Sequence, residues 1–269
     1  MKRKKVGLAL GSGGPKGLVH IGVLKVLLAN NIPIDFISGC SIGAWVGAHY
    51  ALFQDIVSLE KEMVYDYKEK LWSLFDFSLS GGLIKGDKVS AVIIKRFGKK
   101  TFKDLNIPFQ TVAVDLLSGK CDVLKGGMLA PAVQASMAVP ALFKPVRIGD
   151  KYYVDGGIAD PVPDELVRNM GADIVISVNL DNCLGKNRFN EKDLSSVAKV
   201  SARSLDIIRH NLARATLNSS DVVISPCLPI SEYSYWRQYF LGKMGVDLVK
   251  LGEKEARKML PKIKALLNP

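Results

Sequence analysis

A serine stands between two glycines where a strand-like run gives way to a helical one. Residues 36–47 read FISGCSIGAWVG, and one residue separates Ser41 from Gly39 on one side and from Gly43 on the other. In a nucleophile elbow the turn is so tight that only glycine fits at these flanking positions, and the serine hydroxyl projects from its tip. An ordinary strand-to-helix turn with a serine cap has the same letters. The pattern alone leaves both interpretations open.

A glycine-rich segment follows the first strand-like run. Residues 11–17 read GSGGPKG and lead into a helical pattern. Backbone N–H groups at such a helix start bind negative charge, either a phosphate or the oxyanion of an acyl-transfer intermediate. Both nucleotide motifs fail, because Lys16 is followed by glycine rather than Ser or Thr and stands where a Rossmann loop needs its third glycine. If this loop and the serine turn share the carboxyl edge of a sheet, we expect an oxyanion hole.

Three histidines and one aspartate are candidates for the base that would take the serine proton. His20 and His49 lie in helical patterns, where a packed, hydrogen-bonded histidine is the simpler interpretation. His210 lies in an amphipathic helix rather than in a loop after a late strand, as an α/β-hydrolase would require. Asp155 ends a strand-like run before two glycines, so we expect it to be the base; a turn-forming aspartate is the alternative.

Short apolar runs alternate with helical segments along the chain. Strands that are apolar on both faces form a buried, largely parallel sheet with helices on both sides. Helices are predicted at GLVHIGVLKVLLANN and directly after Ser41, and a hairpin at 146–157 turns at Gly149-Asp150. The sequence therefore predicts an α/β fold of three layers, with strands at 6–10, 35–39, 109–116, 173–180 and 221–226.

Composition limits the classes of partner. The chain has 269 residues and a formal charge of +11, which favours acidic partners such as anionic lipid headgroups. The lysines are spread along the sequence without an arginine-rich tract or an aromatic RNA-binding motif, so we expect no nucleic-acid partner. Four well-separated cysteines without a C-x-x-C pair argue against zinc and are expected to be thiols.

No targeting segment is evident in the sequence. The apolar run after MKRKK stops at Gly11, which is too short for the core of a secretory signal. No stretch approaches the roughly 20 apolar residues of a membrane span. We expect a cytoplasmic protein that can meet a membrane peripherally.

The three motifs, in this order, resemble the patatin-like phospholipase family. GLALGSGGPKGLVHIGVLKVL resembles that family's first strand, oxyanion loop and first helix, and FISGCSIGAWVGA resembles its nucleophile elbow. ASMAVPALFKPVRIGDKYYVDGGIADPVP resembles the segment with its dyad aspartate, and NMGADIVISVNL the strand that follows. The resemblance covers about residues 5–180. It implies a patatin-like α/β/α fold with a mostly parallel central sheet, as a single domain over 1–269 that residues 181–269 complete.

The resemblance implies a catalytic dyad of Ser41, the nucleophile, and Asp155, its general base. Backbone amides of the glycine loop would form the oxyanion hole, at Ser12, Gly13 and Gly14. The loop departs from the family pattern at Ser12, where glycine is common, and at Pro15, which has no N–H to donate. The residues expected to support the motifs are Gly11, Lys16, Gly17, Gly39, Gly43, Gly156 and Gly157.

The activity implied by the resemblance is that of a serine lipid acyl hydrolase of the phospholipase A or carboxylesterase type. Ser41 would attack a fatty-acyl ester, and water would hydrolyse the acyl-enzyme. An aspartate of ordinary pKa, about 3.9, is a weak base, so the dyad requires a partly desolvated pocket. No metal or cofactor is expected. The expected partners are a lipid or fatty-acyl ester substrate and an anionic membrane surface.

Two other functions stay open on the sequence alone. One is a regulatory or adaptor protein on a patatin scaffold with weak or lost catalysis, and the other is a nucleotide-binding module that uses the glycine loop. Two aromatic segments bear on lipid entry: residues 71–86 as a mobile lid, and residues 232–244 as an interfacial anchor. Ordinary core packing is the alternative for both segments.

Overall fold

A computed structural model describes residues 3–66, 87–140, 143–182, 189–227 and 244–268. The expected lid at 71–86 and all but the last residue of the aromatic segment 232–244 lie outside the described residues. The elements in chain order are β1 (Val6–Leu10), η1 (Gly14–Gly17), α1 (Leu18–Ala29), β2 (Phe36–Gly39), α2 (Ile42–Phe53), α3 (Ile56–Glu60), η2 (Lys61–Asp66), α5 (Asp87–Phe97), η3 (Phe102–Asp104), β3 (Phe109–Asp115), β4 (Cys121–Leu124), α6 (Leu129–Ser136), β5 (Val146–Ile148), β6 (Lys151–Asp155), η4 (Gly156–Ile158), α7 (Asp164–Asn169), β7 (Ile174–Val178), η5 (Glu191–Asp193), α8 (Val197–Thr216), β8 (Val222–Ile224) and α10 (Met244–Leu267).

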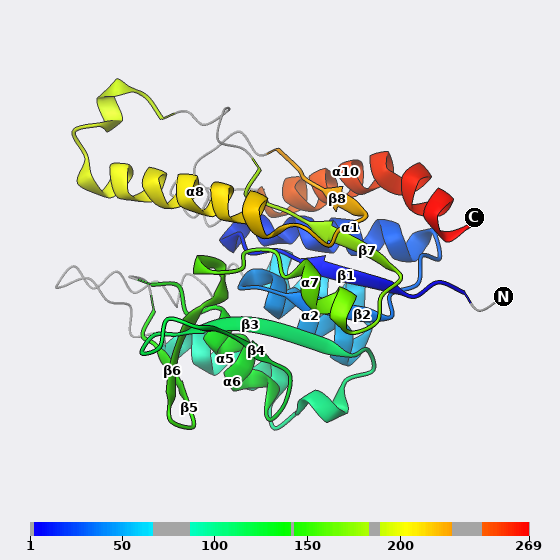
Figure 1. Cartoon of the computed structure of the whole chain (residues 1–269), viewed down its shortest axis with the longest axis horizontal. Helices are drawn as coiled ribbons and strands as arrows, with labels where there is room; N and C mark the ends of the chain where they lie inside the picture. Colours follow the sequence, from blue (N-terminus) through cyan, green and yellow to red (C-terminus); the bar gives the residue numbers. More distant parts are fainter. Residues whose placement is uncertain (1–2, 67–86, 141–142, 183–188, 228–243, 269) are drawn as a thin grey trace.

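The strands form one sheet that runs through the middle of the molecule (Figure 1). Their hydrogen-bonded order is β5-β6-β3-β2-β1-β7-β8, with β4 also paired to β3. Strands β3, β2, β1, β7 and β8 are parallel, whereas β4, β5 and β6 pair antiparallel. The five predicted strands and the predicted hairpin are confirmed, and so is the mostly parallel central sheet.

Helices cover both faces of the sheet because alternate side chains of its central strand point to opposite sides. Leu8 and Leu10 belong to the larger core, which α1, α2 and α10 complete. Ala9 belongs to the smaller core on the other face, with residues of α7 and α8. Gly7 lies on this second face too, since an added Cβ would be 2.6 Å from the Cβ of Val167. These small residues let α7 pack close to β1, which gives the predicted three layers.

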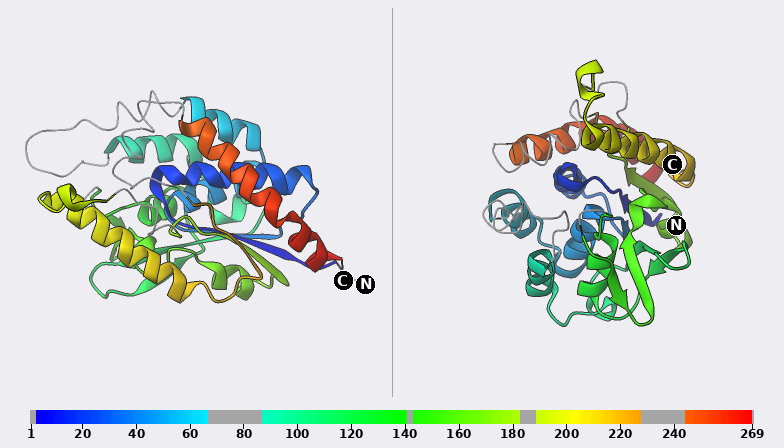
Figure 2. Two further views of the ribbon diagram at one scale, coloured as in Figure 1. Left: turned by 90° about the horizontal axis from the view of Figure 1, so that it is seen from above. Right: turned by 90° about the vertical axis from the view of Figure 1, so that its left-hand side faces the viewer.

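Residues beyond 181 complete both the sheet and a helical layer. Strand β8 adds a parallel strand next to β7, and α10 lies along α1 (Figure 1). The two helices are in close contact at one glycine of each helix. A Cβ added to Gly22 would lie 2.0 Å from the Val249 carbonyl oxygen, and a Cβ added to Gly252 would lie 2.1 Å from the Val19 carbonyl oxygen. Lys4 Nζ donates to the Leu266 carbonyl at 2.6 Å, so the two ends of the chain lie together (Figure 2).

Two properties expected from the sequence have partial outcomes. Among the described residues, no helix is both long and apolar enough to cross a bilayer. Cys40 and Cys121 are free cysteines, but Cys227 is disulfide-bonded, so the expectation that all four cysteines are thiols is wrong. The four cysteines are far apart in the sequence, and such spacing gives no information on which of them fold into contact.

Candidate active site

Two strands end opposite each other beside β3. Strand β2 pairs with the first half of β3, where Gly39 lies opposite Thr111, and β6 pairs antiparallel with the second half, where Asp155 lies opposite Ala113. Because β4 occupies the other edge of β3 along residues 111–114, β2 and β6 share one edge and point toward each other. The turn after β2 and the last residue of β6 therefore meet.

Ser41 occupies the turn between β2 and α2. Its φ of 55° and ψ of −122° lie in a region that a residue with a side chain adopts only under strain. Both flanking glycines are required by close packing. An added Cβ at Gly39 would lie 2.3 Å from the Gly43 carbonyl oxygen, and one at Gly43 would lie 2.1 Å from the Leu10 carbonyl oxygen. The expectation that only glycine fits on either side of the serine is confirmed.

The structure brings Ser41 and Asp155 into direct contact. Ser41 Oγ donates a hydrogen bond of 2.6 Å to Asp155 Oδ2, and the Gly157 N–H donates one of 2.7 Å to Asp155 Oδ1. Both residues are buried, with exposed fractions of 6% and 5%. Burial, and secondarily the Asp155 charge, raises the pKa of the adjacent Cys40 thiol well above its ordinary value. Ser41 is therefore the better candidate nucleophile of the two neighbours.

Two hydroxyls that the sequence interpretation missed form hydrogen bonds to the backbone of the serine turn. The Ser41 N–H donates to Ser136 Oγ at 2.9 Å, and the Thr111 hydroxyl donates to the Gly39 carbonyl at 2.7 Å. The two hydroxyl oxygens are 3.0 Å apart. Since the single Thr111 proton goes to the carbonyl, the Ser136 proton goes to Thr111 Oγ1. This buried chain of hydrogen bonds fixes the backbone on both sides of Cys40.

The glycine loop lies at the end of β1, the neighbour of β2. The Gly11 N–H donates to the Val178 carbonyl at 3.0 Å and the Ser12 N–H to the Pro161 carbonyl at 2.8 Å. Since the Ser12 N–H is already bonded, we do not retain it as an oxyanion donor. Within the described residues, the N–H groups of Gly13 and Gly14 donate no hydrogen bond. The other predicted motif glycines pack tightly against neighbouring atoms: Gly11, Gly17, Gly156 and Gly157.

Lys16 lies on the side of the loop away from the serine turn, against the residues that follow β7. Its Nζ donates to the Leu180 carbonyl at 3.1 Å and lies 3.2 Å from Asp181 Oδ1. Arg209 of α8 reaches the same carboxylate at 3.0 Å and donates to Ser12 Oγ at 3.1 Å. Asp181 and Arg209 were missed in the sequence, where the only signal was the position of Asp181 just past a predicted buried strand.

None of the three histidines, all within the described residues, hydrogen-bonds to Ser41. His20 is buried with its Nε2 2.8 Å from the Gly11 carbonyl, and burial lowers its pKa to about 4. His210 Nδ1 lies 2.7 Å from the Asp181 carbonyl. His49 is also buried, and burial lowers its pKa. The interpretation of His20 and His49 as packed, hydrogen-bonded histidines is confirmed.

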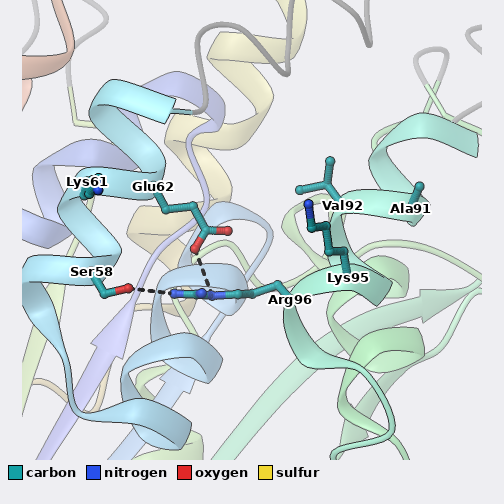
Figure 3. Close-up of a pocket in the computed structure, with 7 residues that line it drawn as sticks. All are labelled: Ser58, Lys61, Glu62, Ala91, Val92, Lys95 and Arg96. Carbon is teal, nitrogen blue, oxygen red and sulfur yellow. Dashed lines mark hydrogen bonds and ion pairs between the residues drawn. The ribbon is translucent and has the colours of Figure 1, made fainter.

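A hollow of about 480 Å³ lies beside the far end of α2 (Figure 3). Arg96 is its central cation: Nε lies 2.8 Å from Glu62 Oε2, Nη2 lies 3.2 Å from Ser58 Oγ, and the guanidinium also contacts His49. None of its lining residues belongs to the serine turn, the glycine loop or the segment at Asp155, so we assign the hollow no part in the candidate active site. The lining residues are Ser58, Lys61, Glu62, Ala91, Val92, Lys95 and Arg96.

Comparisons with known proteins relate the chain to one family. The model of the patatin-like phospholipase family matches residues 8–167. An uncharacterised NTE family protein of Mycobacterium bovis is 34% identical over 180 residues, which are 66% of this chain and 49% of that protein. Lysophospholipase NTE1 of Pyricularia oryzae is 31% identical over 185 residues, which are 66% of this chain and 12% of that protein. The chain thus spans about half the length of the mycobacterial relative and far less of the fungal one.

A solved structure supports the same fold. The crystal structure of VipD from Legionella pneumophila aligns with a TM-score of 0.55 at 16% identity, over 95% of this chain and 67% of that one. At this identity the likeness bears on the fold alone.

Proposed function

Because this chain belongs to the patatin-like phospholipase family, we propose that it is a serine lipid acyl hydrolase that cleaves fatty-acyl esters with Ser41 and Asp155. The observation that carries the proposal is the 2.6 Å hydrogen bond from Ser41 Oγ to Asp155 Oδ2 at a strained turn. A carboxylate in this position both orients the hydroxyl and accepts its proton. Membership of the family, together with this contact, supports a reaction of the phospholipase A or carboxylesterase type.

Acylation would begin with attack of Ser41 Oγ on the ester carbonyl carbon while its proton passes to Asp155 Oδ2. The Gly157 N–H holds the other carboxylate oxygen, so the carboxylate keeps one orientation during the transfer. The N–H groups of Gly13 and Gly14 would donate to the oxyanion of the tetrahedral intermediate. When this intermediate collapses, the alcohol or lysophospholipid leaves with the proton from Asp155, and the acyl group stays on Ser41.

In deacylation, a water molecule would take the place of the serine hydroxyl as the nucleophile. Asp155, again a carboxylate, takes a proton from a water molecule whose oxygen attacks the acyl carbon. The second tetrahedral intermediate uses the same N–H donors and collapses to release the fatty acid, while Ser41 Oγ recovers its proton. Asp155 carries the proton in each step of this scheme, and the loop amides stabilise the negative charge of the oxyanion.

Active-site labelling tests the proposal directly. We expect the wild-type protein to react with a fluorophosphonate and to hydrolyse p-nitrophenyl acyl esters. Ser41→Ala removes the label and lowers turnover at least about 1000-fold, and Asp155→Asn lowers turnover to a similar degree. Ser195→Ala, at an exposed serine, is the matched control. Equal turnover of wild type and Ser41→Ala, each folded by circular dichroism, contradicts the proposal.

The two alternatives are separated by the same experiment and by the contacts of Lys16. A folded wild type without label or turnover favours the adaptor function. A nucleotide site at the glycine loop needs a lysine that reaches phosphates, but Lys16 Nζ is buried against Asp181. The nucleotide alternative therefore has no support from the loop.

We further propose that the protein meets an anionic membrane through the outer side of α8. Val197, Leu205 and Ile208 share one side of this helix and are exposed by 82%, 55% and 57%. Helix α8 extends past the sheet in Figure 1. Exposed Ile158 lies three residues after Asp155, in η4. An apolar surface beside the dyad on a chain of net charge +11 fits a lipid surface of negative charge.

Vesicle sedimentation tests this contact. We expect binding to phosphatidylcholine vesicles that contain phosphatidylglycerol, weaker binding without it, and loss of binding in high salt. The double variant Leu205→Glu, Ile208→Glu loses binding, whereas Val57→Glu, at an exposed apolar position on α3, keeps it. Binding that is unchanged by salt and by the double variant would contradict the proposal.

A further inference from the structure

We propose that Lys16, Asp181 and Arg209 form an ionic triad that positions the oxyanion loop, and that Arg209 of α8 is a positioning residue for the acyl-transfer reaction. The inference rests on the proposed function, because the loop matters to catalysis only if Ser41 forms a tetrahedral intermediate. Neither Asp181 nor Arg209 lies within the residues that the family model matches, 8–167.

The order of the strands places the triad opposite the dyad. Strand β1 lies between β2 and β7, and all three are parallel, so their carboxyl ends meet at one edge of the sheet. The loop that follows β1 therefore has the serine turn on one side and residues 179–181 on the other. A loop held on one side only would be free to move away from the developing oxyanion.

The triad is buried and fully ionic. The side chains of Lys16 and Asp181 are exposed by 9% and 5%, and Arg209 Nη2 lies 3.0 and 3.1 Å from the two Asp181 oxygens. Burial alone would raise the pKa of Asp181, but the charges of Arg209 and Lys16 hold that pKa below its ordinary value.

The hydroxyl of Ser12 links the glycine loop to the triad and lies close to Gly157, which contacts Asp155. Its Oγ accepts from Arg209 Nη2 at 3.1 Å and donates to Asp181 Oδ2 at 3.3 Å. The same oxygen lies 3.2 Å from the position of an added Cβ on Gly157, and the Gly157 N–H holds the Asp155 carboxylate. Ser12, which replaces a glycine common in the family, thus joins α8 to the loop through its side chain.

The variants Arg209→Gln and Arg209→Lys test the triad. The matched control is Arg214→Gln, at an exposed position further along α8. Rates are divided by the fraction of protein that a fluorophosphonate labels at completion, so that loss of folded enzyme does not count. We expect Arg209→Gln to lower kcat about 10- to 100-fold with KM within about twofold, because the loop acts on the transition state. Arg209→Lys recovers part of kcat, and Arg214→Gln matches wild type.

Two further measurements separate positioning from general stability. The affinity of a trifluoromethyl ketone, whose adduct carries an oxyanion, falls with Arg209→Gln in parallel with kcat. Hydrogen exchange of the amides of Gly13, Gly14, Lys16 and Gly17 becomes faster in Arg209→Gln and stays unchanged in Arg214→Gln. Wild-type kcat together with wild-type exchange in Arg209→Gln overturns the inference. If the wild type has no activity, the proposed function fails, while the exchange measurement still decides whether Arg209 holds the loop.

Discussion

The glycine loop after β1 is held differently on its two sides. On the Ser41 side, the backbone fixes the position of the neighbouring turn. The turn is strained, its two glycines are in close contact with other backbone atoms, and β2 and β6 end opposite each other along β3. On the Asp181 side, charged side chains from three separate segments meet in a buried triad. The first arrangement leaves a local signature in the sequence and tolerates few substitutions. The second depends on pairing between distant residues and leaves no short motif.

The largest effect is expected at the backbone side. Gly43→Ala places a methyl group 2.1 Å from the Leu10 carbonyl oxygen, and two backbone segments must move apart. We expect a loss of about 4 kcal/mol or more in the free energy of unfolding, measured by urea denaturation. Gly126→Ala is the control, because an added Cβ there meets nothing within 4 Å. Similar small losses in the two variants would show that the turn relaxes easily.

The second largest loss of stability is expected when the ionic triad of Lys16, Asp181 and Arg209 is broken. Asp181→Asn removes the carboxylate that the buried Lys16 and the half-buried Arg209 share, and we expect a loss of about 3 kcal/mol in the free energy of unfolding. Glu60→Gln removes a carboxylate from the more exposed pair with Lys25, and here the expected loss is about 1 kcal/mol or less. Equal losses in the two variants would mean that the triad is no more tightly coupled than a surface pair.

A pH dependence is expected from His20, which anchors the start of the loop at Gly11. Burial lowers its pKa from an ordinary 6.5 to about 4, so the unfolded chain binds the proton more readily than the folded one. The contribution of the neutral ring is complete above pH 6.5 and is lost as the pH falls toward 4, by up to about 3 kcal/mol. We expect the stability difference between wild type and His20→Asn to shrink over this range in chemical denaturation. Parallel curves would contradict the assignment.

The smallest effect concerns the hydroxyl beneath the serine turn. Ser136→Ala leaves the buried Ser41 N–H without its acceptor, at an expected cost of about 1 to 2 kcal/mol in stability. Turnover should fall with it, because the backbone of the nucleophile is no longer fixed. Ser204→Ala, which removes a hydroxyl bonded to a carbonyl on the exposed part of α8, is the control. Unchanged turnover in Ser136→Ala would confine its role to packing.

The sequence predicted most of the sheet because the central strands are apolar on both faces. Strand β1, for example, is buried at all of its positions and was predicted at its observed bounds. Strand β4 was missed because Cys121–Leu124 is only four residues long and none of its residues is fully buried. Its pairing with β3 comes from the turn that joins them rather than from an apolar pattern.

The site could be predicted where one residue type is dictated by the backbone. Glycines around Ser41 and after Asp155 mark positions where an added Cβ would meet neighbouring atoms, so short motifs led to both residues, and the resemblance to the family is confirmed. Asp181 and Arg209 are separated by 28 positions, and nothing in either local sequence indicates its partner. The bond from the Ser12 N–H to Pro161 also depends on a distant segment.

The opposed ends of β2 and β6 have a consequence for folding. Ser41 and Asp155 are 114 positions apart, and both are set by their register on β3, so a slip of β6 by two residues would separate them by about 7 Å. Long-range strand pairing of this kind forms late, because a large loop must close first. During refolding, the helical signal of α1 and α2 should therefore return before reactivity toward a fluorophosphonate. Reactivity toward the probe therefore reports that both β2 and β6 have paired with β3.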